Sequence, residues 1–295
     1  MAKVLLVVNP SSGGEKAPEF QEMAKEKLGQ HFEEVVVKHT EKAGDASAFA
    51  KEAARNQFEA VFVMGGDGTV NEGVSGLAEE DYRPKFGFFP LGTVNDMARA
   101  LNIPLDPAEA IESLDFTRTK PMDIGKINDD YFMNVVAIGT IPQAVNDTTV
   151  EDKTKLGKLA YAITALKNLA ANQSYTFTVE LDGVEKTIES SLLVIGSTNS
   201  IGGFEQLLPE AEVSDGLMHF IYLKDSNLLE SLQTLPSLLT GVDESNDRVG
   251  YHQIKEIKIS VVDSGDTLRV NVDGDEGDKL PVHIKVLPSH LQVYA

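Results

Sequence analysis

Residues 61–72 read Val61-Phe62-Val63-Met64-Gly65-Gly66-Asp67-Gly68-Thr69-Val70-Asn71-Glu72, and this stretch decides the fold because it passes from a buried strand into a helix. Four consecutive apolar residues are typical of a parallel strand that helices cover on both faces. The glycines allow close backbone approach, so amide N–H groups and the helix N-terminus can face an anion, with Thr69 and Asn71 as further donors. Asp67 would repel a phosphate unless a cation lay between them, which indicates Mg²⁺. A tight turn without a ligand is the alternative for this stretch taken alone.

Two further loops follow strand-like runs in the same way. One reads Pro90-Leu91-Gly92-Thr93-Val94-Asn95-Asp96, where Thr93 and Asn95 are donors and Asn95 or Asp96 is a candidate N-cap. The other reads Asn9-Pro10-Ser11-Ser12-Gly13-Gly14 and leads to Lys16, a natural partner of phosphate. Because ligands of α/β sheets bind outside the carboxyl ends of the strands, we expect all three loops to converge on one nucleotide.

The first part of the chain alternates short apolar runs with amphipathic stretches, which is the pattern of repeated βα units and a parallel sheet. We expect an α/β nucleotide-binding domain over residues 1–121. The predicted strands are Val4–Val8, Val35–Val37, Val61–Met64 and Phe86–Phe89, and the predicted helices are Ala17–Leu28, Asp45–Arg55 and Asn71–Leu77.

After Pro121 the pattern changes to alternating strands separated by turn residues, which predicts a mainly antiparallel, sandwich-like β domain over residues 122–286. A return of the chain end, about residues 287–295, to the first domain is left open. The expected strands are Met122–Ile127, Tyr131–Ile138, Tyr175–Leu181, Glu185–Ile195, Leu217–Leu223, Ile254–Val262, Thr267–Val272, Val282–Val286 and Leu291–Tyr294, with helical insertions at Lys155–Ala171 and near Leu228–Leu239.

Composition narrows the classes of partner. The chain has 295 residues, no cysteine and a formal net charge of −20, so we expect a cytoplasmic protein without disulfides and without affinity for nucleic acid. No run of 18 apolar residues occurs, so any membrane contact is predicted to be peripheral. A local cluster of lysines can dock on lipid head groups or form a solvated helix face: Lys153, Lys155, Lys158 and Lys167.

Neither a P-loop nor a protein-kinase signature is present, so the nucleotide would be held in another way. The three loops, in this order and spacing, resemble the diacylglycerol kinase catalytic domain, which sphingosine and ceramide kinases share. The resemblance runs through nearly the whole chain and implies an ATP-dependent lipid kinase with its active site in a cleft between two domains. It places nucleotide-binding positions at Asn9 through Gly13, Thr40, Gly66 through Glu72 and Thr93.

The resemblance also implies a structural magnesium segment within Pro209–Leu217. Asp215 would bind the ion through its carboxylate, and Glu212 and Leu217 through their backbone carbonyls. Oxygen ligands from a tight acidic turn suit Mg²⁺, which keeps several waters. An ordinary Asp-Gly turn before a strand is the competing interpretation.

The family motif Asp-Gly-Glu ends in the glutamate that is proposed to accept the proton of the lipid hydroxyl. This chain departs from the motif: it reads Asp273-Gly274-Asp275-Glu276, so the matching position is Asp275, which is one methylene shorter. We expect Asp275 to act as the base with help from Asp273, because an aspartate accepts a proton as a glutamate does. A simple acidic hairpin turn is the alternative.

The acceptor implied first is diacylglycerol, which would give phosphatidic acid at the membrane surface. Two other functions stay open: a kinase of a soluble substrate, since NAD kinases also carry Gly-Gly-Asp-Gly-Thr, and a nucleotide-binding regulator without catalysis. The segment from Lys155 to Lys167 resembles a family region with functional lysines, and we expect it to help dock the protein on the membrane. Exposed strands of the second domain could also pair in a homodimer.

Overall fold

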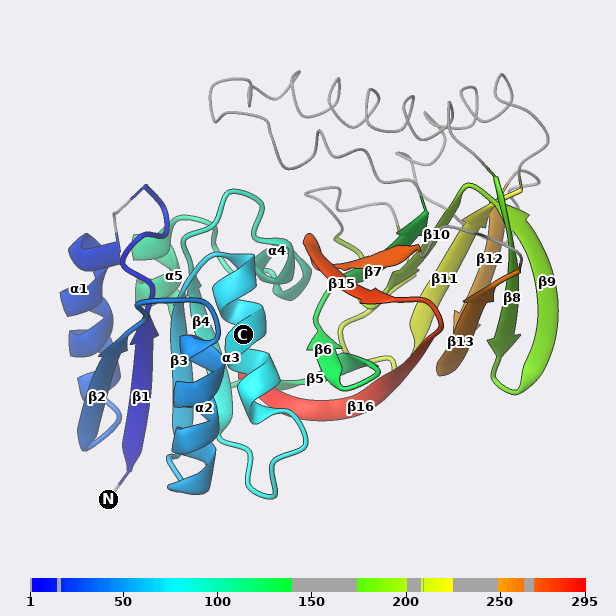
Figure 1. Cartoon of the computed structure of the whole chain (residues 1–295). Coiled ribbons are helices and arrows are strands. Elements are labelled where there is room, and N and C mark those ends of the chain that lie inside the picture. The colour runs from blue at the N-terminus through cyan, green and yellow to red at the C-terminus, as the bar shows by residue number, and fades with distance from the viewer. Residues whose placement is uncertain are drawn as a thin grey trace.

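A computed structural model describes residues 2–14, 17–139, 174–200, 208, 210–224, 249–262 and 268–295 (Figure 1). Lys16 and the lysine cluster between Lys153 and Lys167 lie outside these ranges, as do both predicted helical insertions. None of the helices within them is long and apolar enough to cross a membrane.

The first part of the chain forms a parallel sheet between two layers of helices, as predicted. Its strands are β1 (Lys3–Val8), β2 (Glu34–His39), β3 (Ala60–Gly65) and β4 (Lys85–Pro90), in the order β2-β1-β3-β4. The helices are α1 (Ala17–Gly29), α2 (Asp45–Arg55), α3 (Asp67–Leu77), α4 (Asp96–Leu101) and α5 (Pro107–Ser113).

The sheet separates two apolar cores because its strands alternate between two covered faces. Val61 and Val63 pack with α2 and α3, whereas Phe62 and Met64 pack with α1 and α5. Every residue of β3 is buried, which explains its uninterrupted apolar sequence. Burial of each such side chain contributes about 1.5–3 kcal/mol, so the strand that leads to the glycine loop is held firmly.

The second part is a β-sandwich. One sheet has the order β12-β11-β10-β7-β14-β15, and β13, β8 and β9 continue the other sheet beyond β16. The strands are β6 (Asp130–Phe132), β7 (Val135–Gly139), β8 (Tyr175–Leu181), β9 (Val184–Ser190), β10 (Leu192–Gly196), β11 (Met218–Leu223), β12 (Val249–Ile254), β13 (Glu256–Val261), β14 (Arg269–Val272) and β15 (Asp275–Lys279). Phe177 and Ile257 from one sheet meet Ile195 and Phe220 from the other in a common core.

Several strand predictions were wrong in their bounds. The predicted strand Tyr131–Ile138 is two strands, β6 and β7, which lie in different sheets. The predicted strand Glu185–Ile195 is divided at Ser191 into β9 and β10, which lie in different sheets. The predicted strand from Ile254 begins instead at Glu256, because Ile254 ends β12 in the opposite sheet. The two predicted strands at the chain end are one strand, β16 (Val282–Tyr294).

β16 links the two halves of the molecule. It pairs antiparallel with β5 (Thr119–Ile127) from Ile284↔Ile127 to Tyr294↔Thr119, with an irregularity between Leu287 and Leu291. Near its end Val293 pairs parallel with Phe86 of β4, so β16 curves from the sandwich into the first sheet (Figure 1). The predicted domain division at residue 121 falls within β5 and stays a prediction.

Candidate active-site cleft

The glycine-rich loops meet at the carboxyl ends of the parallel strands. Asn9 N donates to Met64 O at 3.0 Å, and Leu91 N donates to Gly65 O at 2.8 Å. Thr40, which follows β2, donates its backbone N–H to Val8 O at 2.9 Å. The structure therefore brings together the three predicted loops and Thr40 at one edge of the sheet, as expected for strand ends that face the same way.

Asn9 connects its own loop, Asn9–Gly14, with the glycine-rich loop that begins at Gly65. Its Nδ2 donates to Thr69 Oγ1 at 2.9 Å, and its Oδ1 accepts from Ser11 N at 3.1 Å and Ser11 Oγ at 2.9 Å. The side chain thus fixes both the turn of its own loop and the first turn of α3. Pro10, Ser12 and Gly13 complete this loop, and Gly13 has a φ of +64°.

The loop that begins at Gly65 and the loop Pro90–Asp96 touch through glycine backbones. A Cβ atom on Gly92 would lie 2.5 Å from Asn95 Oδ1 and 3.0 Å from Gly66 Cα, and one on Gly65 would lie 2.7 Å from Thr69 Cβ. These separations are below van der Waals contact, so a larger residue would push the loops apart. Glycine at these positions is a packing requirement as well as an opportunity for phosphate binding.

Asp67 and Asn95 hold the loop that precedes α4. Asp67 Oδ2 accepts a 2.8 Å hydrogen bond from Asn95 N, while the Asn95 side chain bonds both Gly92 N (2.8 Å) and Gly92 O (3.0 Å). Asn95 has a left-handed φ of 56° at the N-cap of α4, without a side-chain cap bond. Burial raises the pKa of the Asp67 carboxyl, and the neighbouring charge of Asp96 acts in the same direction.

Asp273 faces this loop from the second half of the molecule. Its carboxylate accepts from the backbone N–H groups of Met133 (2.8 Å), Asn134 (3.0 Å) and Val135 (2.8 Å), which precede and begin β7. Burial raises its pKa to about 6, against the effect of these bonds, and the charge of Asp67 raises it further. Two carboxylates from the two halves are therefore close enough to interact across a cleft.

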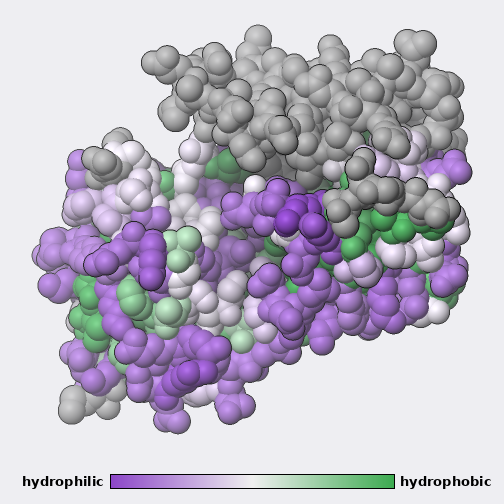
Figure 2. All heavy atoms as spheres, viewed as in Figure 1, coloured by the Kyte–Doolittle hydropathy of each residue, from purple (hydrophilic) through white to green (hydrophobic). Residues whose placement is uncertain are grey.

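Asp275 lines a cavity of about 400 Å³ in this cleft. One wall is α2 and α3, with Ser47, Asn71 and Ser75. The other walls are the β5–β6 and β14–β15 hairpins, and hydrophilic side chains gather on this side of the molecule (Figure 2). Oδ1 of Asn71 is buried and has no hydrogen-bond partner among the described residues.

The neighbouring acids differ in their contacts. Glu276 lines the same cavity but pairs with Arg269 at 3.2 Å, and both of these side chains are exposed. Asp275 is exposed at the start of β15 and lines the cavity. The resemblance predicts that Glu72 binds the nucleotide. In the structure its Oε2 accepts a 3.2 Å hydrogen bond from Ala46 N and so contacts the first turn of α2. Thr93 is exposed on its loop, and Gly68 lies in the first turn of α3.

The predicted magnesium segment folds around Asp215. Its Oδ2 accepts from Glu212 N at 3.1 Å and its Oδ1 from Leu217 N at 2.8 Å, and His219 Nε2 lies 3.2 Å from Oδ2. Although burial opposes ionisation, the contact with His219 and these backbone bonds lower the pKa of Asp215, which keeps the carboxylate charged. Glu212 and Leu217 contact Asp215 through their backbone N–H groups, and the role of their carbonyls as Mg²⁺ ligands stays a prediction.

Asp123 of β5 was missed in the sequence, and it connects this segment to the chain end. It accepts from Gly216 N at 2.6 Å and from Ser289 N at 2.5 Å, and burial together with nearby Asp215 raises its pKa. A cation beside Asp215 would relieve this repulsion, so the residues fit Mg²⁺. Among the described residues, however, no three acidic or histidine side chains form a metal site by themselves, so backbone oxygens and water would complete the shell.

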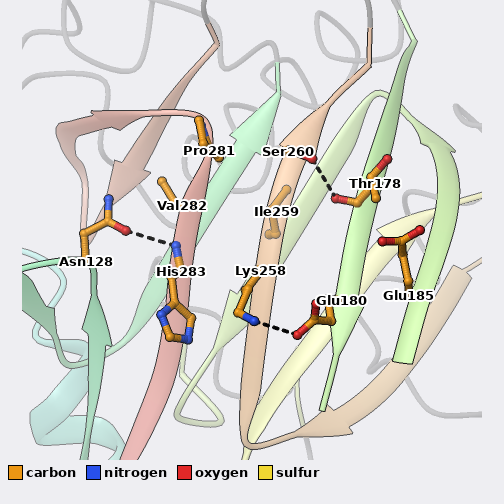
Figure 3. A pocket seen from close by; sticks show the side chains of 10 residues that line it. All are labelled: Asn128, Thr178, Glu180, Glu185, Lys258, Ile259, Ser260, Pro281, Val282 and His283. Carbon is orange, nitrogen blue, oxygen red and sulfur yellow. Dashed lines mark hydrogen bonds and ion pairs between the residues drawn. The ribbon is translucent and has the colours of Figure 1, made fainter. Parts of the chain in front are cut away.

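A second groove, of about 350 Å³, lies on the sandwich (Figure 3). Its polar groups are largely engaged with each other: Lys258 Nζ is 2.7 Å from Glu180 Oε1, and Asn128 Oδ1 accepts from His283 N at 3.0 Å. It lies apart from the glycine loops, and its residues converge on no common point.

Comparison with known proteins agrees with this geometry. The family model of the diacylglycerol kinase catalytic domain matches residues 3–127, and that of the YegS C-terminal NAD kinase beta sandwich-like domain matches residues 134–295. A protein of Streptococcus pneumoniae serotype 4 named "Putative lipid kinase" is 42% identical over 100% of this chain and 98% of its own length.

Two further relatives carry the name diacylglycerol kinase. The one from Staphylococcus aureus strain MRSA252 is 37% identical over 98% of this chain and 91% of its own. A crystal structure of the other, from Bacillus anthracis str. Sterne, has a TM-score of 0.80 at 25% identity and covers 99% of this chain and 97% of its own.

Proposed function

This chain belongs to the bacterial diacylglycerol kinase and lipid kinase family and is an ATP-dependent lipid kinase, and from this premise we propose that its acceptor is the hydroxyl of diacylglycerol, which becomes phosphatidic acid. The observation that carries the proposal is the cavity that Asn71 of the glycine-rich loop and Asp275 line together. One predicted nucleotide loop and the candidate base thus border the same space.

In the proposed reaction the loops hold ATP. The amide groups at the start of α3, together with Thr69, Asn71 and Asn95, would bind and orient the phosphates, with Lys16 as a further partner. When bound with the nucleotide, Mg²⁺ neutralises phosphate charge. The lipid hydroxyl oxygen attacks the γ-phosphorus, the bond to the β-phosphate oxygen breaks, and ADP leaves.

Asp275 would take the hydroxyl proton during this attack. A carboxylate lining the cavity has the access that a general base needs, and Asp273 is held by three backbone N–H groups so that it can orient the turn. Positioning and electrostatics supply most of the rate enhancement in such transfers. A second Mg²⁺ at Asp215 would be structural, with the backbone carbonyls of Glu212 and Leu217.

Because the proposed acceptor resides in a membrane, the protein would work in the cytoplasm at the membrane surface. The segment from Lys155 to Lys167 remains the predicted contact with lipid head groups. The predicted homodimer also remains a proposal, which the molecular mass in solution would test.

The test measures transfer of labelled γ-phosphate from ATP with Mg²⁺ to diacylglycerol, phosphatidylglycerol, a sphingoid base and undecaprenol in mixed micelles, and to NAD in solution. Asp275→Asn is compared with Glu276→Gln, an adjacent acid that pairs with Arg269. We expect labelled phosphatidic acid, reduced about 100-fold or more by Asp275→Asn and little by Glu276→Gln. Labelling of NAD alone would reject a lipid acceptor, and ATP binding without any product would favour a regulator.

A further inference from the structure

The hairpin of β5 and β6 stands between the phosphate-binding helix and the strand that begins with Asp275. Its two strands pair through Gly125↔Phe132, Lys126↔Tyr131 and Ile127↔Asp130. Ile127, Asp129, Asp130 and Tyr131 line the cleft cavity. Movement of this hairpin would therefore change the cleft itself.

Glu79 fastens one side of the hairpin to the end of α3. Its Oε2 accepts from Tyr131 Oη at 2.6 Å and pairs with Lys126 Nζ, which also lies 5.3 Å from the centre of the Tyr131 ring. The Glu79 backbone N–H donates to His290 Nε2 at 2.9 Å, within the irregular part of β16. One residue, two positions after the end of α3, thus contacts β5, β6 and β16.

Asn128 fastens the other side of the hairpin to β15. Its Nδ2 donates to Asp278 Oδ2 at 2.7 Å, and its Oδ1 accepts from His283 N at 3.0 Å. Asn128 has a φ of 50°, a conformation that asparagine and aspartate tolerate better than most residues. Asp278 belongs to the same short strand as Asp275.

We propose that the β5–β6 hairpin is a bridge that sets the position of Asp275 relative to the phosphate loops, with Glu79 and Asn128 as its positioning residues. Glu79 contacts Tyr131 at one side of the paired hairpin, and Asn128 at its turn contacts Asp278, so the hairpin itself joins the two contacts. The role assigned to Asp275 rests on the proposed function. The existence of the bridge itself does not depend on the proposed function.

The bridge matters because phosphoryl transfer depends on placement. A shift of about 1 Å between reacting groups can reduce a rate about 100-fold, even when the altered residue is remote from the chemistry. In the proposed reaction the nucleotide contacts are made by the loops and not by the hairpin. Loosening the bridge should therefore lower kcat while leaving the KM for ATP nearly constant.

The first experiment exchanges the donor and the acceptor of the hydrogen bond between Asn128 and Asp278. Asn128→Asp places two carboxylates together, and we expect kcat to fall about 10-fold with the KM for ATP within about twofold. The double variant Asn128→Asp with Asp278→Asn restores one donor and one acceptor without changing net charge, and we expect kcat to recover to within about threefold of wild type. Equal activity of Asn128→Asp and wild type, or no recovery in the double variant, would overturn the proposal.

A second measurement tests the bridge without enzymatic activity. The natural chain has no cysteine, so spin labels at Glu22→Cys in α1 and Thr187→Cys in β9, both exposed, report the distance between the two halves. Glu79→Ala should broaden this distance distribution. Its matched control is Glu180→Ala, which removes another Glu–Lys pair, 2.7 Å from Lys258 and away from the cleft, and should leave the distribution as in wild type (Figure 3).

The two arms separate the two proposals. A wild type that phosphorylates no lipid, together with broadening in Glu79→Ala alone, rejects the proposed acceptor and supports the bridge. Identical distributions in wild type, Glu79→Ala and Glu180→Ala reject the bridge, whatever lipid is phosphorylated.

Discussion

Ser200 Oγ donates a 2.6 Å hydrogen bond to Asp96 Oδ1, and both side chains are buried. Asp96 opens α4 beside the nucleotide loops, whereas Ser200 follows β10 of the sandwich. The bond therefore ties the two halves together at a point distinct from the β5–β16 pair.

Ser200→Ala should destabilise the protein by about 1–3 kcal/mol, because it takes one partner from a buried carboxylate oxygen. Urea unfolding followed by circular dichroism measures this change. Ser260→Ala is the control: Ser260 makes a long 3.5 Å bond to Thr178 O, and its loss should cost less than about 0.5 kcal/mol. Equal effects of the two changes would show that the Asp96 contact adds little.

Gly92→Ala should weaken ATP binding about tenfold or more, which corresponds to about 1.4 kcal/mol. The added methyl group would meet Asn95 Oδ1 at 2.5 Å and the Gly66 backbone at 3.0 Å, so the two loops must separate. Calorimetric titration with ATP gives the dissociation constant. Gly29→Ala, at the end of α1 with nothing within 4 Å of the new atom, should bind ATP as wild type does.

Asp273 should make the protein less stable as pH rises from about 4 to about 6. Its folded-state pKa of about 6 lies above the ordinary 3.8, so its contribution is fully present below pH 3.8 and is lost as pH rises through 6. The shift corresponds to about 3 kcal/mol.

Asp273→Asn removes this titration. Denaturant unfolding between pH 4 and 7 should show a smaller decline for the variant than for wild type. Parallel curves for the two proteins would mean that Asp273 has the same proton affinity in the folded and unfolded states.

Mg²⁺ should raise the thermal midpoint of the wild-type protein, by the equivalent of about 2.7 kcal/mol at a concentration 100 times its dissociation constant. Asp215→Asn should lose most of this effect, since the charged carboxylate is the expected side-chain ligand. Thermal scans with Mg²⁺ and with EDTA, both without nucleotide, make the comparison. A rise of the same size in Asp215→Asn would place the stabilising ion elsewhere.

The parallel sheet and its loops could be predicted because their signals are local. An apolar run followed by Gly65-Gly66-Asp67-Gly68 indicates a strand and then a helix, and the structure has β3 and α3 there, although α3 begins at Asp67 and not at the predicted Asn71. The meeting of the loops follows from parallel topology alone. The contact of the Glu72 carboxylate with the backbone of α2 could not be predicted from a local pattern, and the nucleotide-binding role of Glu72 stays a prediction.

The strand divisions could not be predicted, because side chains and not turn residues make them. At the β9–β10 corner Ser190 Oγ bonds Leu192 O at 2.8 Å, and no glycine or proline marks the change of sheet. Between β12 and β13, Asp182 Oδ1 accepts from Lys255 N at 3.0 Å and Glu256 N at 2.9 Å. In the sequence, Ser190 and Asp182 look like ordinary strand or turn residues.

Long-range polar contacts were beyond sequence reasoning for a related reason. Ser200 and Asp96 are 104 residues apart, and Glu79 and Tyr131 are 52 apart, so no spacing rule joins them. Asp123 is a similar case, since an aspartate inside a strand pattern gives no sign that it will accept backbone bonds from residues 216 and 289.

The course of β16 has a consequence for biosynthesis. β4 pairs with β3 on one side, and it receives a neighbour on its other side only when Val293 pairs with Phe86. During translation this edge of the nucleotide-binding sheet therefore stays open until nearly the whole sandwich has left the ribosome. Chaperone demand should therefore depend on how soon β16 forms.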